Sequence, residues 1–204
     1  QNRENKIINS AKTKAQISKG LSRSGLDRAT LAKEIWYKCA IPSILYCSEV
    51  LVFSNQSISK LETIQNDIGK FILQIPTSSA NLVVWTDSGL IPIKDRIMTR
   101  QATYYWNLLQ LKEDSLLLQC FNEVRNNKRD PWNKQIQEII NNAGDFTKCT
   151  SKKQVKNMIK THSIEKIKTI FIEQSSTQAL TLPKKWFKLK RHNNDYIARS
   201  TKCQ

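Results

Sequence analysis

Apolar residues recur at intervals of three and four along most of this 204-residue chain. Side chains spaced in this way share one face of an α-helix, whereas a half-buried β-strand would need strict alternation. The stretch 4–20 is typical, because its isoleucines and alanines fall broadly on one side, with lysines opposite and a glycine at the end. Those apolar residues are Ile7, Ile8, Ala11, Ala15 and Ile17. The pattern predicts an all-α fold, an irregular bundle of roughly six to nine helices.

Polar residues mark where several of these helices begin. Asp27 is placed to cap a helix that runs through Leu31, because a carboxylate accepts hydrogen bonds from the first amide groups. Ser57 or Ser59 can cap the next long helix, with Glu62 completing a capping box after Ser59. For residues 44–53 the apolar run leaves helix and strand both open.

Within the long helix that starts near residue 57, the apolar positions leave Gln65, Asn66 and Lys70 facing solvent. Pro76 ends this helix, and Asp95 starts another long one. Large apolar and aromatic residues in the least charged third of the chain are interpreted as core rather than as a ligand pocket. They are Leu45, Tyr46, Phe71, Trp85, Tyr104, Tyr105 and Trp106.

The net charge of +16 is unevenly distributed. Residues 1–33 hold eight basic and two acidic residues, residues 34–125 hold eight and nine, and residues 126–204 hold seventeen and six. The nearly neutral middle coincides with the most apolar sequence, so the two flanks carry the field that attracts a polyanion. The distribution favours contact with nucleic acid over lysines that merely solvate helices.

Two basic clusters are the candidate contacts. The first helix carries Lys12, Lys14, Lys19 and Arg23, which can follow phosphates without reading bases. The second cluster combines five basic residues with a tryptophan that can stack on an unpaired base. Its members are Lys184, Lys185, Trp186, Lys188, Lys190 and Arg191. The alternatives for this cluster are a nuclear localisation signal and a tail that Trp186 and Phe187 anchor to the core.

A further helix is expected to follow Thr150 or Ser151. Its apolar side carries Val155 and Ile159, and its lysines lie on the opposite side. Those lysines are Lys152, Lys153, Lys156 and Lys160.

Three pieces between residues 41 and 93 occur in an order that resembles one known family. The pieces are IPSILYCSEVLVF, SKLETIQNDIGKFILQIP and TSSANLVVWTDSGLIPIKDRI. The matching positions are Pro42, Ile44, Leu45, Tyr46 and Glu49, then Leu61, Glu62, Gln65, Lys70, Ile72, Leu73 and Pro76, then Ser78, Ser79, Gly89, Leu90, Pro92 and Ile93. Together they resemble the region downstream of the polymerase core in non-LTR (LINE-type) retrotransposon reverse transcriptases. Cys47 stands where that family usually has glycine, and Lys70 where it usually has arginine.

The resemblance implies a division of the chain and a role for each part. Residues 1–125 are expected to be a thumb-like helical region that holds the template–primer duplex, with Lys70 among its contacts. Residues 126–204 are expected to be a basic helical extension and tail, because the polar, proline-containing stretch 126–132 marks a boundary. The expected partners are RNA, an RNA–DNA hybrid or DNA, together with the remainder of the parent polymerase.

The resemblance also implies that catalysis belongs outside this chain. Polymerases of this class bind Mg²⁺ through paired aspartates of the palm, which precedes a region like this one, and the chain contains no Asp-Asp pair. We therefore expect no enzymatic activity and no cofactor in the isolated chain. One alternative function is a structural or protein-interaction helical module of the same polyprotein. A free-standing basic DNA-binding protein is a weaker one.

Five cysteines form no C-x-x-C pair and have no histidine at ligand spacing, which favours reduced thiols and no metal site. Cys39, Cys47 and Cys120 are interpreted as small core residues. The sequence leaves open whether Cys203 begins a zinc knuckle farther downstream. The longest apolar stretch, residues 39–47, is too short to span a bilayer, and an intracellular location in nucleus and cytoplasm is expected. Because the first residue is glutamine, we expect coding sequence upstream.

Overall fold

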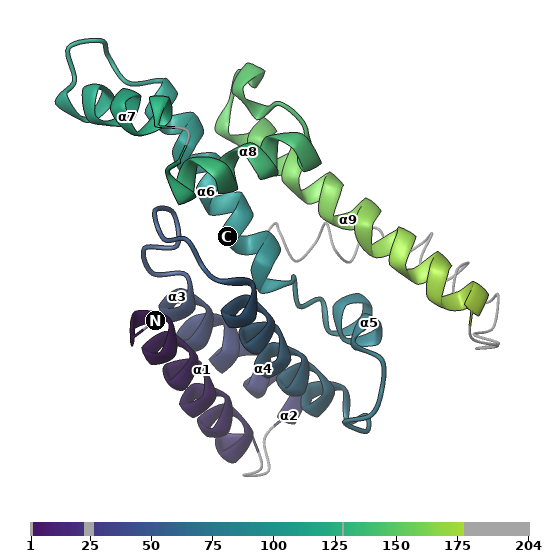
Figure 1. Cartoon of the computed structure of the whole chain (residues 1–204). Coiled ribbons are helices and arrows are strands. Elements are labelled where there is room, and N and C mark those ends of the chain that lie inside the picture. The colour runs from purple at the N-terminus through teal and green to yellow at the C-terminus, as the bar shows by residue number, and fades with distance from the viewer. Residues whose placement is uncertain (1, 23–26, 128, 178–204) are drawn as a thin grey trace. The chain divides into compact units, whose positions relative to one another are not determined.

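The structure is a computed structural model that describes residues 2–22, 27–127 and 129–177. Over these residues every regular element is a helix, so the prediction of an all-α fold is confirmed (Figure 1). The chain divides into two compact units, residues 1–163 and residues 164–204. The predicted boundary at 125/126 falls inside the first unit, one residue before the end of the helix Leu116–Asn126. The assignment of residues 1–125 to a thumb-like region stays a prediction.

The first elements of the chain surround one central helix. They are α1 (Asn2–Leu21), α2 (Arg28–Ile35), the π-helical turn η1 (Trp36–Ala40), α3 (Ile41–Ile44) and α4 (Asn55–Leu73). The helix α4 packs against both α1 and α2, and it lies beside α1 in Figure 1. Asp27 caps α2 as predicted, because its carboxylate accepts the amide groups of Ala29 and Thr30. Ser54 rather than Ser57 or Ser59 caps α4, so the predicted capping box with Glu62 is wrong.

The chain continues through α5 (Asn81–Val83), the π-helical turn η2 (Val84–Ser88) and α6 (Ile93–Leu109). It then forms α7 (Leu116–Asn126), α8 (Pro131–Ala143), the 3₁₀ turn η3 (Phe146–Lys148) and α9 (Lys152–Thr177). Two hydrophobic cores result. The N-terminal half of α6 lines the first core together with α1–α4, and its C-terminal half lines the second core with α7, α8 and η3.

The second core is built around aromatic rings. Tyr105 of α6 meets Phe121 of α7 edge to face at 5.3 Å between ring centroids, and meets Phe146 of η3 at 5.9 Å in the same geometry. Such pairs stabilise a core by about 0.5–1.5 kcal/mol each beyond the area they bury. Because Trp132 of α8 also packs on Tyr105, the break at 126–132 connects elements of one core.

The central helix α4 buries two polar side chains that the sequence pattern predicted to face solvent. Gln65 accepts the indole N–H of Trp36 at 3.4 Å and donates to the carbonyl of Ile91 at 2.9 Å. Asn66 accepts the indole N–H of Trp85 at 2.9 Å. The prediction that Gln65 and Asn66 face solvent is therefore wrong, since each satisfies a tryptophan donor that would otherwise lose its hydrogen bond with water.

Other residues expected in the core lie at the surface. Tyr46 is 70% exposed, and the thiols of Cys39 and Cys120 are exposed as well, so those interpretations are wrong. Cys47 is half-buried. In contrast, Tyr105 is buried as predicted, and Phe71, Trp85, Tyr104 and Trp106 are half-buried with their rings against one of the two cores.

We expect Gly69→Ala to destabilise the protein, because α4 and η2 approach each other closely at this residue. A Cβ atom on Gly69 would lie 2.1 Å from Cγ1 of the fully buried Val84, and overpacking of this kind costs about 1–3 kcal/mol. Gly20→Ala in α1 is the matched control, because its Cβ would meet nothing within 4 Å. That change should instead stabilise by up to about 1 kcal/mol through helix propensity. Urea unfolding of both variants measures the contrast, and equal effects would contradict the close approach.

Candidate nucleic-acid interface

The lysines of α1 do not form a single row. Lys12 and Lys14 are two residues apart, so their side chains leave the helix about 200° apart. Lys12 is exposed, whereas Lys14 is half-buried on the other flank. Lys19 lies on the Lys12 side, but its ammonium pairs with Asp67 at 2.5 Å and sits 5.8 Å from the ring of Phe71. Of these three predicted contacts, Lys12 is therefore the one whose charge is fully presented to solvent.

Lys70 has a partner within the protein. Its ammonium donates a hydrogen bond of 2.7 Å to the carbonyl of Thr77, just beyond the C-terminus of α4. A cation at this end of a helix offsets the partial negative charge of the last carbonyl groups. The geometry gives Lys70 a local structural role, and its predicted contact with nucleic acid stays a prediction.

The remaining predicted contacts lie outside the described residues. They are Arg23 and the tail cluster Lys184, Lys185, Trp186, Lys188, Lys190 and Arg191.

A basic row on α9 is the clearest candidate surface in the described part of the chain. Lys153, Lys156 and Lys160 are spaced by three and four residues, so they lie on one face of the helix. All three are exposed, and none makes an ion pair with another described residue. The row spans about 10 Å along the helix axis. That length corresponds to roughly three phosphates along one strand of a duplex.

The apolar side of α9 holds this row in place. Val155 and Ile159 are completely buried in the second core, and the hydroxyl of Ser163 donates to the carbonyl of Ile159 at 3.0 Å. The sequence placed these lysines opposite that apolar side, which the structure confirms. The predicted interface did not include Lys153, Lys156 and Lys160, although their spacing of three and four residues indicates a shared helix face.

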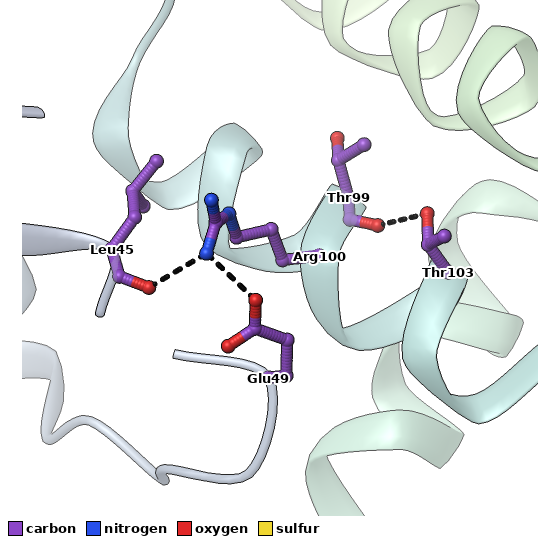
Figure 2. A network of polar contacts seen from close by, with 5 residues as sticks. All are labelled: Leu45, Glu49, Thr99, Arg100 and Thr103. Atoms are coloured by element: carbon purple, nitrogen blue, oxygen red, sulfur yellow. Dashed lines mark hydrogen bonds and ion pairs between the residues drawn. The ribbon is translucent and has the colours of Figure 1, made fainter. Parts of the chain in front are cut away.

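The motif Leu45–Glu49, which carries part of the family resemblance, forms a turn docked on α6. Figure 2 shows Arg100 between the carbonyl of Leu45, at 3.0 Å, and the carboxylate of Glu49, at 2.7 Å. Next to it, the hydroxyl of Thr103 donates to the carbonyl of Thr99 at 2.6 Å within the same helix. Arg100 thus fixes the turn through one backbone and one charged contact.

Two further side chains hold the same turn from other positions. The indole N–H of Trp132 in α8 donates to the carbonyl of Glu49 at 2.8 Å. The amide of Gln101 in α6 donates to the carbonyl of Leu51 at 3.0 Å and to Gln135 of α8 at 3.1 Å. The turn is therefore fixed by two different helices, although Tyr46 and Val50 on it remain exposed.

The backbone of this turn adopts a conformation that suits glycine. Cys47 has φ of 57°, in the left-handed region that side chains with a Cβ atom rarely occupy. This is the position where the LINE-type sequences that the chain resembles usually have glycine.

The carboxylate of Glu62 serves α6 rather than its own helix. Pro92 precedes α6 and offers no side-chain cap, and Oε1 of Glu62 accepts the backbone N–H of Lys94 at 2.9 Å. Oε2 is buried without a partner in the described residues. Burial raises the pKa of Glu62 from 4.5 to about 7, with the backbone bond from Lys94 opposing and the nearby Asp95 reinforcing the shift.

The described residues offer no group of three or more histidine, cysteine or acidic side chains arranged to hold a metal ion. No described helix is long and apolar enough to cross a bilayer. Comparison with protein-family models, with curated proteins and with solved structures found no match.

We expect Cys47→Gly to stabilise the protein by about 1 kcal/mol, because glycine occupies the left-handed region without steric cost. Cys47→Ala removes the thiol but keeps the Cβ atom, so this control should show no gain. Denaturant midpoints of the two variants measure the difference. Equal stabilities for the glycine and alanine variants would show that the backbone conformation carries no strain.

We expect the free energy of unfolding to fall as the pH rises from about 4.5 to about 7. In that window the folded protein holds a proton on Glu62 that the unfolded chain releases, so folding takes up a proton. Because the proton concentration falls as the pH rises, the folded state becomes less stable. Glu62→Gln keeps an acceptor for Lys94 and removes the titration. The native protein should lose on the order of 2 kcal/mol relative to this variant between pH 5 and pH 8. Parallel pH profiles in urea unfolding would contradict the protonation of Glu62.

Proposed function

We propose that this chain is a helical segment of a LINE-type reverse transcriptase that holds RNA, an RNA–DNA hybrid or DNA through its phosphate backbone. Polymerisation would be carried out by a palm outside the chain, with its own paired aspartates and Mg²⁺. The partners are then a nucleic acid and the remainder of the polymerase. The residue pattern at 41–93 supports the parentage, and the charge of +16 supports the nucleic-acid role.

The exposed row Lys153, Lys156 and Lys160 is the observation that carries the binding proposal. A protein that only needs solubility does not require three unpaired ammonium groups aligned on one helix face. Binding to a duplex releases condensed counterions, and aligned cations achieve this without reading base edges. Lys12 on α1 is a further exposed lysine that makes no ion pair with another described residue.

A second candidate function is a structural or protein-interaction module of the same polyprotein, with no direct contact to nucleic acid. This alternative is favoured by Lys19 and Lys70, because both ammonium groups already have partners inside the protein. Under this function the lysines of α9 would only solvate the surface.

Neutralising the α9 row separates the two functions. The variant Lys153→Gln, Lys156→Gln and Lys160→Gln should bind a 20-base-pair RNA–DNA hybrid more weakly, because each lost cation removes about one released counterion. The slope of log affinity against log salt concentration should become shallower by about 2–3. Filter binding at several salt concentrations gives both values.

The matched control removes three exposed lysines elsewhere, as Lys38→Gln, Lys60→Gln and Lys112→Gln, and changes the net charge equally. Its salt slope should stay close to that of the native protein. Equal slopes for all three proteins, or equal affinity for heparin at every salt concentration, would favour the protein-interaction function. The parentage is tested separately by the coding sequence upstream of Gln1, where a palm with paired aspartates is expected.

A further inference from the structure

The segment between the docked turn and α4 has an open backbone. Residues 51–54 are in no helix or turn, and Ser54 has extended backbone angles. The amide and carbonyl of Val52 make no hydrogen bond within the described part of the chain. The same holds for Phe53, whereas at the two ends of this pair the carbonyl of Leu51 accepts from Gln101 and the amide of Ser54 donates to Glu4. Val52 therefore presents a free donor and a free acceptor between two fixed residues.

A hollow of about 200 Å³ adjoins this segment. Its apolar lining comes from Ile7 of α1 and from Leu51, Val52 and Phe53, and its rim carries Arg3 and Glu4. Val52 is 40% exposed at its edge. The hollow is large enough for one aliphatic side chain, and Val52 itself is among the residues that line it.

The two charges at the rim are not equivalent. The carboxylate of Glu4 is occupied, because it accepts the hydroxyl of Ser54 at 2.7 Å and also that of Ser57. These hydrogen bonds hold the pKa of Glu4 below its usual value and keep the group ionised. Arg3 is exposed and makes no ion pair with a described residue. The free charge at the hollow is thus positive, which favours an acidic group on whatever binds there.

We propose that residues 51–54 bind an extended peptide segment of another protein by strand addition. One residue of the peptide exchanges both backbone hydrogen bonds with Val52, as paired residues of two strands do. A neighbouring apolar side chain fills the hollow, and an acidic side chain pairs with Arg3. The proposal goes beyond nucleic-acid binding and does not depend on it.

The surrounding geometry suits such a site because the edge is held still before the peptide arrives. Gln101 fixes Leu51, Glu4 fixes Ser54, and Arg100 and Trp132 fix the preceding turn. An edge that is already ordered loses little conformational freedom on binding. The side chains of Tyr46 and Val50 on that turn are exposed as well.

The site can be tested with a library of random dodecapeptides whose termini are blocked. Peptides are selected for binding to the full chain and counter-selected against binding to the Val52→Pro variant. Proline removes the backbone N–H, which has no partner to lose, so the fold should be kept and circular dichroism checks this. The control Val52→Thr keeps the N–H and the branched side chain. We expect peptides that combine aliphatic and acidic residues, that bind the native protein and the Val52→Thr variant alike, and that bind Val52→Pro about tenfold more weakly.

Two further measurements separate strand addition from an ordinary pocket. N-methylation at each residue of a selected peptide in turn should weaken binding about tenfold at the one residue that pairs with Val52 and leave the other positions unchanged, because the protein offers one open carbonyl to the peptide there. Arg3→Glu should abolish the preference for acidic peptides. The proposal is overturned if no selected peptide distinguishes Val52→Pro from Val52→Thr, or if no single methylated position weakens binding. It is also overturned if Val52→Pro weakens binding of a single-stranded RNA instead.

Discussion

The fold depends on two neighbouring amide side chains in the middle of α4. Gln65 and Asn66 each accept an indole N–H, from Trp36 of one π-helical turn and from Trp85 of the other. Leaving a buried donor of this kind unpaired costs about 1–3 kcal/mol, so the two tryptophans can enter the first core only where these amides meet them. The close approach of Gly69 to Val84 completes the same contact between α4 and η2. These interactions set how the first core closes.

The sequence predicted the helical class and several helix boundaries because those depend on local chemistry. Asp27 caps α2 as expected, and the break before Pro131 lies where the polar stretch indicated. The same reasoning failed for Gln65 and Asn66, since periodicity assigns an amide to solvent and cannot register a tryptophan donor 29 or 19 residues away. It failed for Glu62 for a similar reason, because the helix that this carboxylate caps is α6 and not its own.

The candidate interface was predictable to the extent that charge and helix register suffice. The sequence predicts that Val155 and Ile159 lie on the opposite side of α9 from its lysines, and the structure confirms this. The partners of Lys19 and Lys70 could not be foreseen, because both depend on the chain folding back onto itself. Net charge therefore overstates the number of cations that remain available to a polyanion. The strand-addition segment was equally hidden, since an open backbone group leaves no mark in a sequence.

One helix, α6, supplies wall residues to both cores, with Ile93 and Ile97 in the first and Ala102 and Tyr105 in the second. Gln101 lies between these two sets and reaches both Leu51 and Gln135. Truncating the chain after residue 125 would remove Trp132 and Phe146 from their contacts with Tyr105. The apolar side chains on the C-terminal half of α6 would then be exposed to water, on the same helix that lines the first core. A truncation that is meant to keep both cores therefore has to end beyond Ile159 of α9.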